Sequence, residues 1–165
     1  MAEIEPSEAG AVRLRLEVEE AGLLKQLLGE MRTLLDADVP RSDPVIERLF
    51  PDAHDEAEQA QAYRDLVETE LRAGKLNALE AVEQDLPGAT RGALSLPADH
   101  VEMWLTSLTD MRLAIGTRLE ATEELMAADL DTDAEDAPAL NVMHWLGWLQ
   151  EMMVRAITEQ TEGPE

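Results

Sequence analysis

An arginine within an apolar helical stripe is the residue whose position most directly suggests chemistry. Arg112 falls in the stripe that continues to Ile115, so an amphipathic helix would carry its guanidinium toward the core. A buried guanidinium needs a carboxylate partner, because an unpaired buried charge is costly. The expected partner is Glu70, with Glu20 or Glu151 as alternatives. We interpret this as a structural ion pair that fixes helix register, and binding of a ligand by Arg112 is the alternative.

The stretch Ala137–Ile157 holds two of the three tryptophans and predicts a helix that is apolar around most of its circumference. Such a helix normally has neighbours on several sides, so we expect it at the centre of the domain. One polar strip, with a tryptophan beside it, is the candidate interaction surface: His144, Trp148, Glu151 and Arg155. Tryptophans and methionines at helical spacing more often belong to a core, and lone histidines more often lie at the surface.

Metal and catalytic patterns are weak. The acidic run that begins at Asp129 resembles a calcium loop, but Ala134 and Leu140 stand where an EF-hand needs glycine and glutamate. The chain has no cysteine, and its three histidines lack the spacing of a zinc site: His54, His100 and His144. No nucleophile motif and no phosphate-binding loop is present. We therefore predict no catalytic residues, no metal and no cofactor.

The elements that position these residues are mainly helical. Long helices are expected over 17–35, 56–85, 97–119 (with an extension toward 127) and 137–157, and the short helix Pro44–Phe50 is capped by Asp43. Pro87-Gly88 is expected to end the second long helix. The alternating segments Val12–Leu16 and Gly92–Leu96 predict a minimal two-stranded antiparallel ribbon packed on the bundle.

The domain organisation predicted from these elements is simple. Residues 1–10 are expected to be disordered, residues 11–157 to form one helical domain, and residues 158–165 to be a flexible C-terminal tail. A chain of 165 residues is long enough to bury a sizeable core as one domain.

The charge restricts the partners. The formal net charge is -23, and such a field repels nucleic acid, whose binding depends on lysine and arginine at phosphates. Direct binding to nucleic acid or to an anionic membrane is therefore not expected, whereas a basic protein partner suits the charge. No secretory signal and no run of about 18 apolar residues is present, so we expect a cytoplasmic protein.

Five segments carry a family resemblance: VRLRL from Val12, IERLFP, AYRDL, WLTSLTDMRLAIGTRLE and HWLGWLQE. In content and order they resemble an actinobacterial family, formerly classed as a domain of unknown function and typically encoded beside the Clp adaptor ClpS. Its members are named after the oxidative-stress regulator AosR. The resemblance covers roughly Val12 to Ile157.

This resemblance implies a non-enzymatic regulator that acts on transcription through a sigma factor or RNA polymerase. The regulator that names the family senses oxidants through cysteines, so thiol sensing does not carry over to this cysteine-free chain. Two alternatives remain. The gene neighbourhood suggests an adaptor or accessory factor for Clp proteolysis, and a pocket near Arg112 would suggest a small-ligand-binding protein or an enzyme. A homodimer through Trp148 or the first helix is compatible with each.

Overall fold

The computed structural model describes residues 1–8, 11–36, 42–50, 57–126 and 137–161. Within these ranges the elements follow in the order β1 (Glu3–Pro6), β2 (Val12–Arg15), α1 (Val18–Leu34), α2 (Pro44–Leu49), α3 (Ala57–Arg91), β3 (Leu94–Leu96), α4 (Ala98–Met126) and α5 (Ala137–Thr161). The predicted architecture of four long helices, one short helix and a small antiparallel sheet is confirmed.

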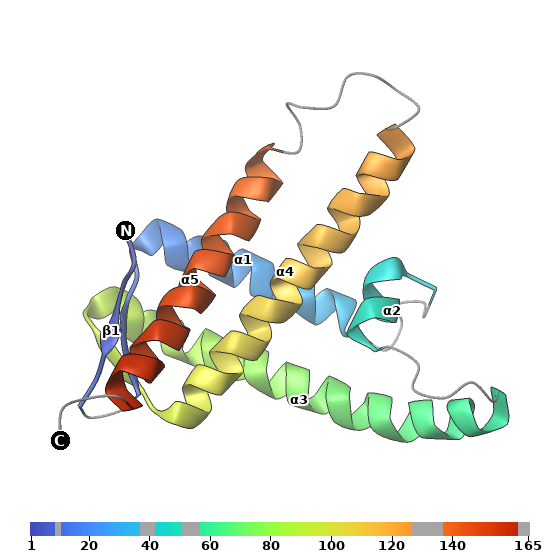
Figure 1. Cartoon of the computed structure of the whole chain (residues 1–165), viewed down its shortest axis with the longest axis horizontal. Helices are drawn as coiled ribbons and strands as arrows, with labels where there is room; N and C mark the ends of the chain where they lie inside the picture. Colours follow the sequence, from blue (N-terminus) through green and yellow to red (C-terminus); the bar gives the residue numbers. More distant parts are fainter. Residues whose placement is uncertain (9–10, 37–41, 51–56, 127–136, 162–165) are drawn as a thin grey trace.

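Helix α4 lies at the centre of the bundle. It packs against α1, α2, α3, α5 and β3, and it runs beside α5 in Figure 1, with α3 crossing near its first turns. Its Trp104, Val101 and Leu108 are almost completely buried. The expectation that the tryptophan-rich helix α5 is the central one is therefore wrong, because α5 packs mainly on α4 and β1.

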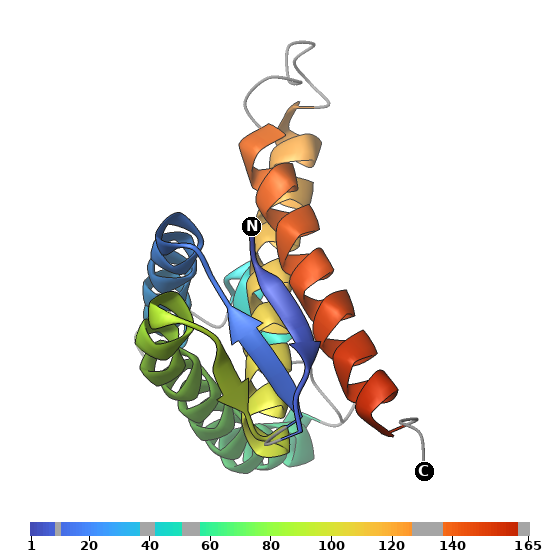
Figure 2. The same ribbon diagram turned by 90° about the vertical axis from the view of Figure 1, so that its left-hand side faces the viewer.

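The sheet has three strands rather than two. Strand β2 pairs antiparallel with both β1 and β3, and Ile4, Leu14 and Leu94 lie in one row across it. One face packs on the bundle, as Figure 2 shows, and the other carries paired charges such as Glu3 opposite Arg15. The predicted antiparallel partnership of the segments around β2 and β3 is confirmed.

The N-terminal segment contradicts the expected disorder of residues 1–10, because β1 occupies Glu3–Pro6. Only Ala2 and Ile4 turn an apolar side chain inward there, and both are buried. Two alternating apolar positions are too few to predict a strand, and β1 is stabilised by pairing with β2 and by packing on α5.

The helix boundaries follow local chemistry in part. The Asp43 side chain accepts a hydrogen bond from the Val45 amide (2.9 Å), which confirms the predicted cap of α2. The predicted stop of α3 at Pro87-Gly88 is wrong, since α3 continues one turn further to Arg91. A Cβ on Gly88 would lie 3.1 Å from a Leu94 methyl, so this turn approaches β3 closely.

The C-terminal boundary also differs from the prediction. Helix α5 continues past Ile157 to Thr161, so the first residues of the expected flexible tail are helical. The remaining residues of that tail, 162–165, lie outside the described residues.

Among the residues that the structure describes, one buried side-chain hydroxyl lacks a hydrogen-bond partner. Ser107 on α4 is 1% exposed, and its Oγ has no hydrogen-bond partner among the residues that the structure describes. Ser107→Ala should raise the free energy of unfolding by about 1 kcal/mol, because it removes an unsatisfied buried group and favours the helix. Chemical denaturation of both proteins measures the difference.

The matched control is the buried Thr117, whose hydroxyl donates to the Leu113 carbonyl (2.7 Å) and contacts Arg48. Thr117→Val should lower the unfolding free energy by about 1 kcal/mol, because it breaks these bonds. A loss of stability in Ser107→Ala would show that its hydroxyl is satisfied.

Candidate functional site

Helix α5 carries the four residues that the sequence suggested as an interaction surface. Its buried face consists of Leu146, Leu149, Met153 and Ala156. On the opposite side His144, Glu151 and Arg155 are exposed and Trp148 is half-buried. Arg155 donates to Glu151 one turn away (2.8 Å), an exposed pair that contributes little to stability. The four residues recur at helical spacing and share one accessible side of α5, as predicted.

Arg112 does not form the predicted buried ion pair. Its side chain is exposed and donates to the Gln150 Oε1 on α5 (2.8 Å), while Gln150 in turn donates to the Thr109 hydroxyl (2.6 Å). A Cβ on Gly147 would lie 3.3 Å from the Arg112 Cζ, so the guanidinium lies against this glycine. Arg112 thus links α4 to α5 at the surface, and Glu70 is an exposed residue of α3.

Glu20, an alternative partner for Arg112, has other bonds. Its carboxylate accepts from the Ala2 amide (3.2 Å), the Glu17 amide (3.1 Å) and the Trp145 indole (3.2 Å). The Glu17 bond belongs to a capping box at the start of α1. Glu20 therefore ties the N-terminal segment, α1 and α5 together. The remaining alternative, Glu151, bonds Arg155 instead.

Within the described residues, a buried ion pair joins α3 and α4 through side chains that the sequence patterns did not single out. Lys75 Nζ lies 2.9 and 3.0 Å from the two carboxylate oxygens of Asp110, and the two side chains are 16% and 8% exposed. Burial raises the pKa of Asp110, while Lys75 opposes this effect. No local signal predicted this burial, because helical geometry places Asp110 on the opposite side of α4 from Val101 and Leu108 in the expected apolar stripe.

A second polar cluster lies at the α3–α4 corner. The Oδ2 of Asp85 accepts from the buried Trp104 indole (2.9 Å) and lies 2.8 Å from His100 Nδ1. This hydrogen bond with Asp85 raises the pKa of His100 above its ordinary value of 6.5. Trp104 and His100 are one helical turn apart on α4, so one carboxylate of α3 serves both.

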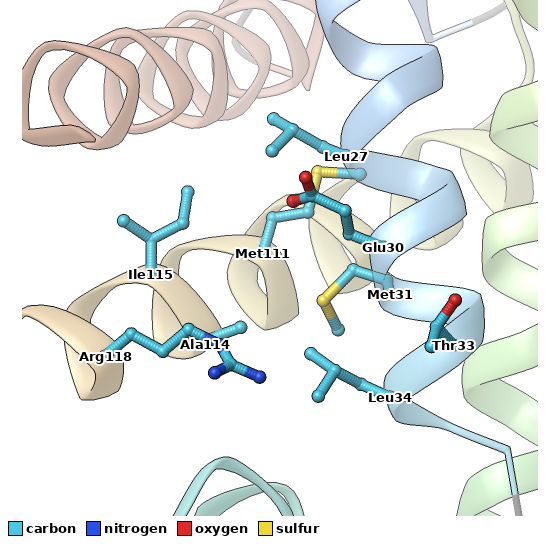
Figure 3. A pocket seen from close by; sticks show the side chains of 9 residues that line it. All are labelled: Leu27, Glu30, Met31, Thr33, Leu34, Met111, Ala114, Ile115 and Arg118. Atoms are coloured by element: carbon cyan, nitrogen blue, oxygen red, sulfur yellow. The ribbon is translucent and has the colours of Figure 1, made fainter. Parts of the chain in front are cut away.

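A groove lies between α1 and α4 on the described part of the surface. It has a volume of about 430 Å³. In Figure 3, α1 and α4 each contribute three apolar side chains: Leu27, Met31, Leu34, Met111, Ala114 and Ile115. The exposed Glu30, Thr33 and Arg118 provide its polar margin. Arg112, near which the sequence suggested a ligand pocket, does not line this groove.

Metal ligands and membrane-spanning helices are two further features that would indicate function. In the described ranges, no three His, Cys, Asp or Glu side chains come together as metal ligands could. The acidic run from Asp129 to Asp136, and also His54, lie outside the described residues. Among the helices that the structure describes, none has both the length and the apolar character needed to cross a bilayer.

Comparison with protein families matches residues 1–157 to the domain of unknown function DUF2017. The chain belongs to this family. The match includes all three strands and the five described helices, up to four residues before the end of α5. No curated protein and no solved structure matches the chain.

The buried Lys75–Asp110 pair yields a pH-dependent prediction. Lys75→Met leaves the Asp110 carboxylate buried without its cation, so we expect a loss of about 3 kcal/mol in unfolding free energy at pH 7. The folded-state pKa of Asp110 is raised, and Lys75→Met should raise it further, since Lys75 opposes the effect of burial. The folded state then binds the additional proton, so the loss should shrink as the pH falls toward 4.

Chemical denaturation from pH 4 to pH 7 measures this dependence. The double variant Lys75→Met/Asp110→Leu is the control, because it removes both charges, and it should recover to within about 1 kcal/mol of the unmodified protein. Equal losses in the single and double variants would contradict a coupled pair.

His100 gives a second pH dependence. Its pKa is raised mainly by a hydrogen bond with Asp85, whereas the pKa of Asp110 is raised by burial. Because its folded-state pKa is raised, its contribution to stability is fully present below pH 6.5 and is lost as the pH rises through the raised value. Asp85→Asn should return the His100 pKa toward 6.5, as measured by an NMR titration of the imidazole ring. Asp99→Asn, which removes a weaker charge contribution, should lower it less. An unchanged pKa in Asp85→Asn would be inconsistent with this bond.

Proposed function

We propose that this protein is a non-enzymatic cytoplasmic regulator that docks on a basic surface of a sigma factor or of RNA polymerase. The observation that carries the proposal is the net charge of -23, from 36 acidic and 13 basic residues. Such a surface is repelled by nucleic acid and is attracted by a basic protein surface, which raises both the association rate and the selectivity for that partner.

The resemblance of five segments to the AosR-like actinobacterial regulators supports a role in the oxidative-stress response. This chain contains no cysteine, so oxidation of a thiol in this protein is not part of the proposal. The oxidative signal instead reaches the complex through the partner or through a residue other than cysteine.

The arrangement of polar side chains supports docking rather than catalysis. The carboxylates of Asp110, Asp85 and Glu20 each accept a hydrogen bond from a different segment of the chain. Each of them therefore links two or more parts of the fold. The face of α5 that carries Glu151 and Arg155 is exposed, and its half-buried Trp148 offers an aromatic anchor of the kind that often dominates interface energetics. We assign the docking surface to this face.

The proposal is tested by affinity purification of the tagged protein from its native host, before and after peroxide, with mass spectrometry of the captured proteins. We expect a sigma factor or RNA polymerase to be enriched. Glu151→Lys should reduce this enrichment at least about fivefold, because it reverses a charge at the proposed contact.

The matched control is Glu102→Lys, which makes the same charge change at an exposed residue of α4 outside this face. It should leave the enrichment nearly unchanged. Enrichment of Clp subunits in place of the transcription machinery would favour the Clp adaptor and overturn the proposal, as would capture of neither set.

A further inference from the structure

We infer that Arg112 on α4 and Trp148 on α5 together form the contact for an acidic side chain of the protein partner. The carboxylate of an aspartate or glutamate binds the Arg112 guanidinium, and an apolar neighbour of that residue packs on Trp148. This inference rests on the proposed function, because it uses the α5 docking face. It adds the chemical group that this face recognises at short range.

Neutral groups of two helices hold the Arg112 guanidinium. Its Nη1 donates to Gln150 Oε1 (2.8 Å), and Gln150 Nε2 donates to the Thr109 hydroxyl (2.6 Å) and the Leu105 carbonyl (3.5 Å). A Cβ on Gly147 would lie 3.3, 3.4 and 3.5 Å from the Arg112 Cζ, Nη2 and Nε, so the flat face of the guanidinium covers this glycine. A partner therefore meets an arginine whose conformation is already restricted, which lowers the entropic cost of binding it.

Arg112 has unused donors and no carboxylate partner. A guanidinium carries five N–H donors. Within the described residues Arg112 makes one hydrogen bond, to Gln150, and no ion pair. Glu151, one helical turn beyond Gly147, bonds Arg155 instead. In a chain with 36 acidic residues, this exposed arginine is thus bonded to a neutral group alone, and its free donors match the two oxygens of a carboxylate from another molecule.

The surroundings of Arg112 favour a protein side chain over a free anion or a nucleic acid. Trp148 follows Gly147 directly, so an indole lies next to the guanidinium-covered part of α5, and it is half-buried. Arginine and tryptophan are the residues that most often dominate protein interfaces. A small anion would leave Trp148 unused, and a polyanion is repelled by the net charge of -23.

The inferred contact and the net charge act over different distances. The negative field of the molecule attracts a basic protein surface before contact is made. At contact, a uniformly basic surface places a cation against Arg112, which is unfavourable, whereas a carboxylate within that surface is attracted. Arg112 therefore selects, among basic surfaces, one that has an acidic residue at this position.

The test uses the full chain labelled with ¹⁵N and two probe peptides of about four helical turns. The first has one central glutamate, a leucine one turn to either side, and alanine and glutamine elsewhere. The second has glutamine in place of the glutamate. The glutamate peptide should shift the NMR signals of Arg112 Nε–H and the Trp148 indole along one saturable curve. It should bind at least about fivefold more tightly than the glutamine peptide, because charge-assisted hydrogen bonds are the stronger ones.

Three variants separate this contact from general attraction of a carboxylate to arginine. Arg112→Gln should reduce the preference for the glutamate peptide to less than about twofold, because it removes the cation. Arg91→Gln makes the same change at an exposed arginine of α3 that also has no ion pair in the described ranges, and it should leave the preference unchanged. Gln150→Met keeps the charge of Arg112 but frees its guanidinium, so the preference should fall to an intermediate value.

The inference is overturned if neither peptide binds, if both bind equally, or if Arg112→Gln and Arg91→Gln have equal effects. It is also overturned if the Nε–H signal of Arg13, an exposed arginine on the outer face of the sheet, shifts as much as that of Arg112. These outcomes do not depend on the identity of the natural partner. The purification experiment therefore still decides the proposed function if the peptides fail, and the peptide result stands if the purification fails.

Discussion

Burial of one side of α4 is the constraint on which the rest of the fold depends. Trp104 is fully buried, and its indole can only be accommodated because Asp85 on α3 accepts its hydrogen bond. An unpaired buried indole would lose the solvation that it has in the unfolded chain. This one contact therefore fixes how α3 crosses α4, and the Lys75–Asp110 pair fixes the same crossing further along.

The interior bonds of this acidic protein depend on a few donors. Lys75 neutralises the Asp110 carboxylate. The indoles of Trp104 and Trp145 donate hydrogen bonds to the carboxylates of Asp85 and Glu20, and each of these three bonds joins two elements of the fold. Most other carboxylates in the described ranges lie at the surface, where they give the molecule a strongly negative field. The same composition thus separates into two roles: paired carboxylates link helices to each other, and solvated carboxylates give the field that, in the proposed function, attracts a basic partner.

The accessible side of α5 and the groove also follow from the packing of α4. Because α5 packs on α4 through Leu146, Leu149 and Met153, its opposite side faces solvent. Because α1 and α4 meet only in part, their side chains leave an apolar groove with a carboxylate at its margin. The proposed docking face is therefore a consequence of how α5 packs on α4.

Local sequence patterns were sufficient to predict the helical architecture, the cap of α2, the antiparallel pairing of β2 and β3 and the accessible side of α5. Each of these depends on periodicity or on capping chemistry, which act within a few residues. The partners of polar side chains depend instead on how the helices cross. Arg112 lies at the edge of the apolar side of α4, next to the buried Met111, so a small rotation of the helix decides whether its side chain is buried or exposed. The crossing of α3 places Lys75 rather than Glu70 near the core. Strand β1 and the groove likewise depend on neighbours distant in the chain, so local patterns could not predict them.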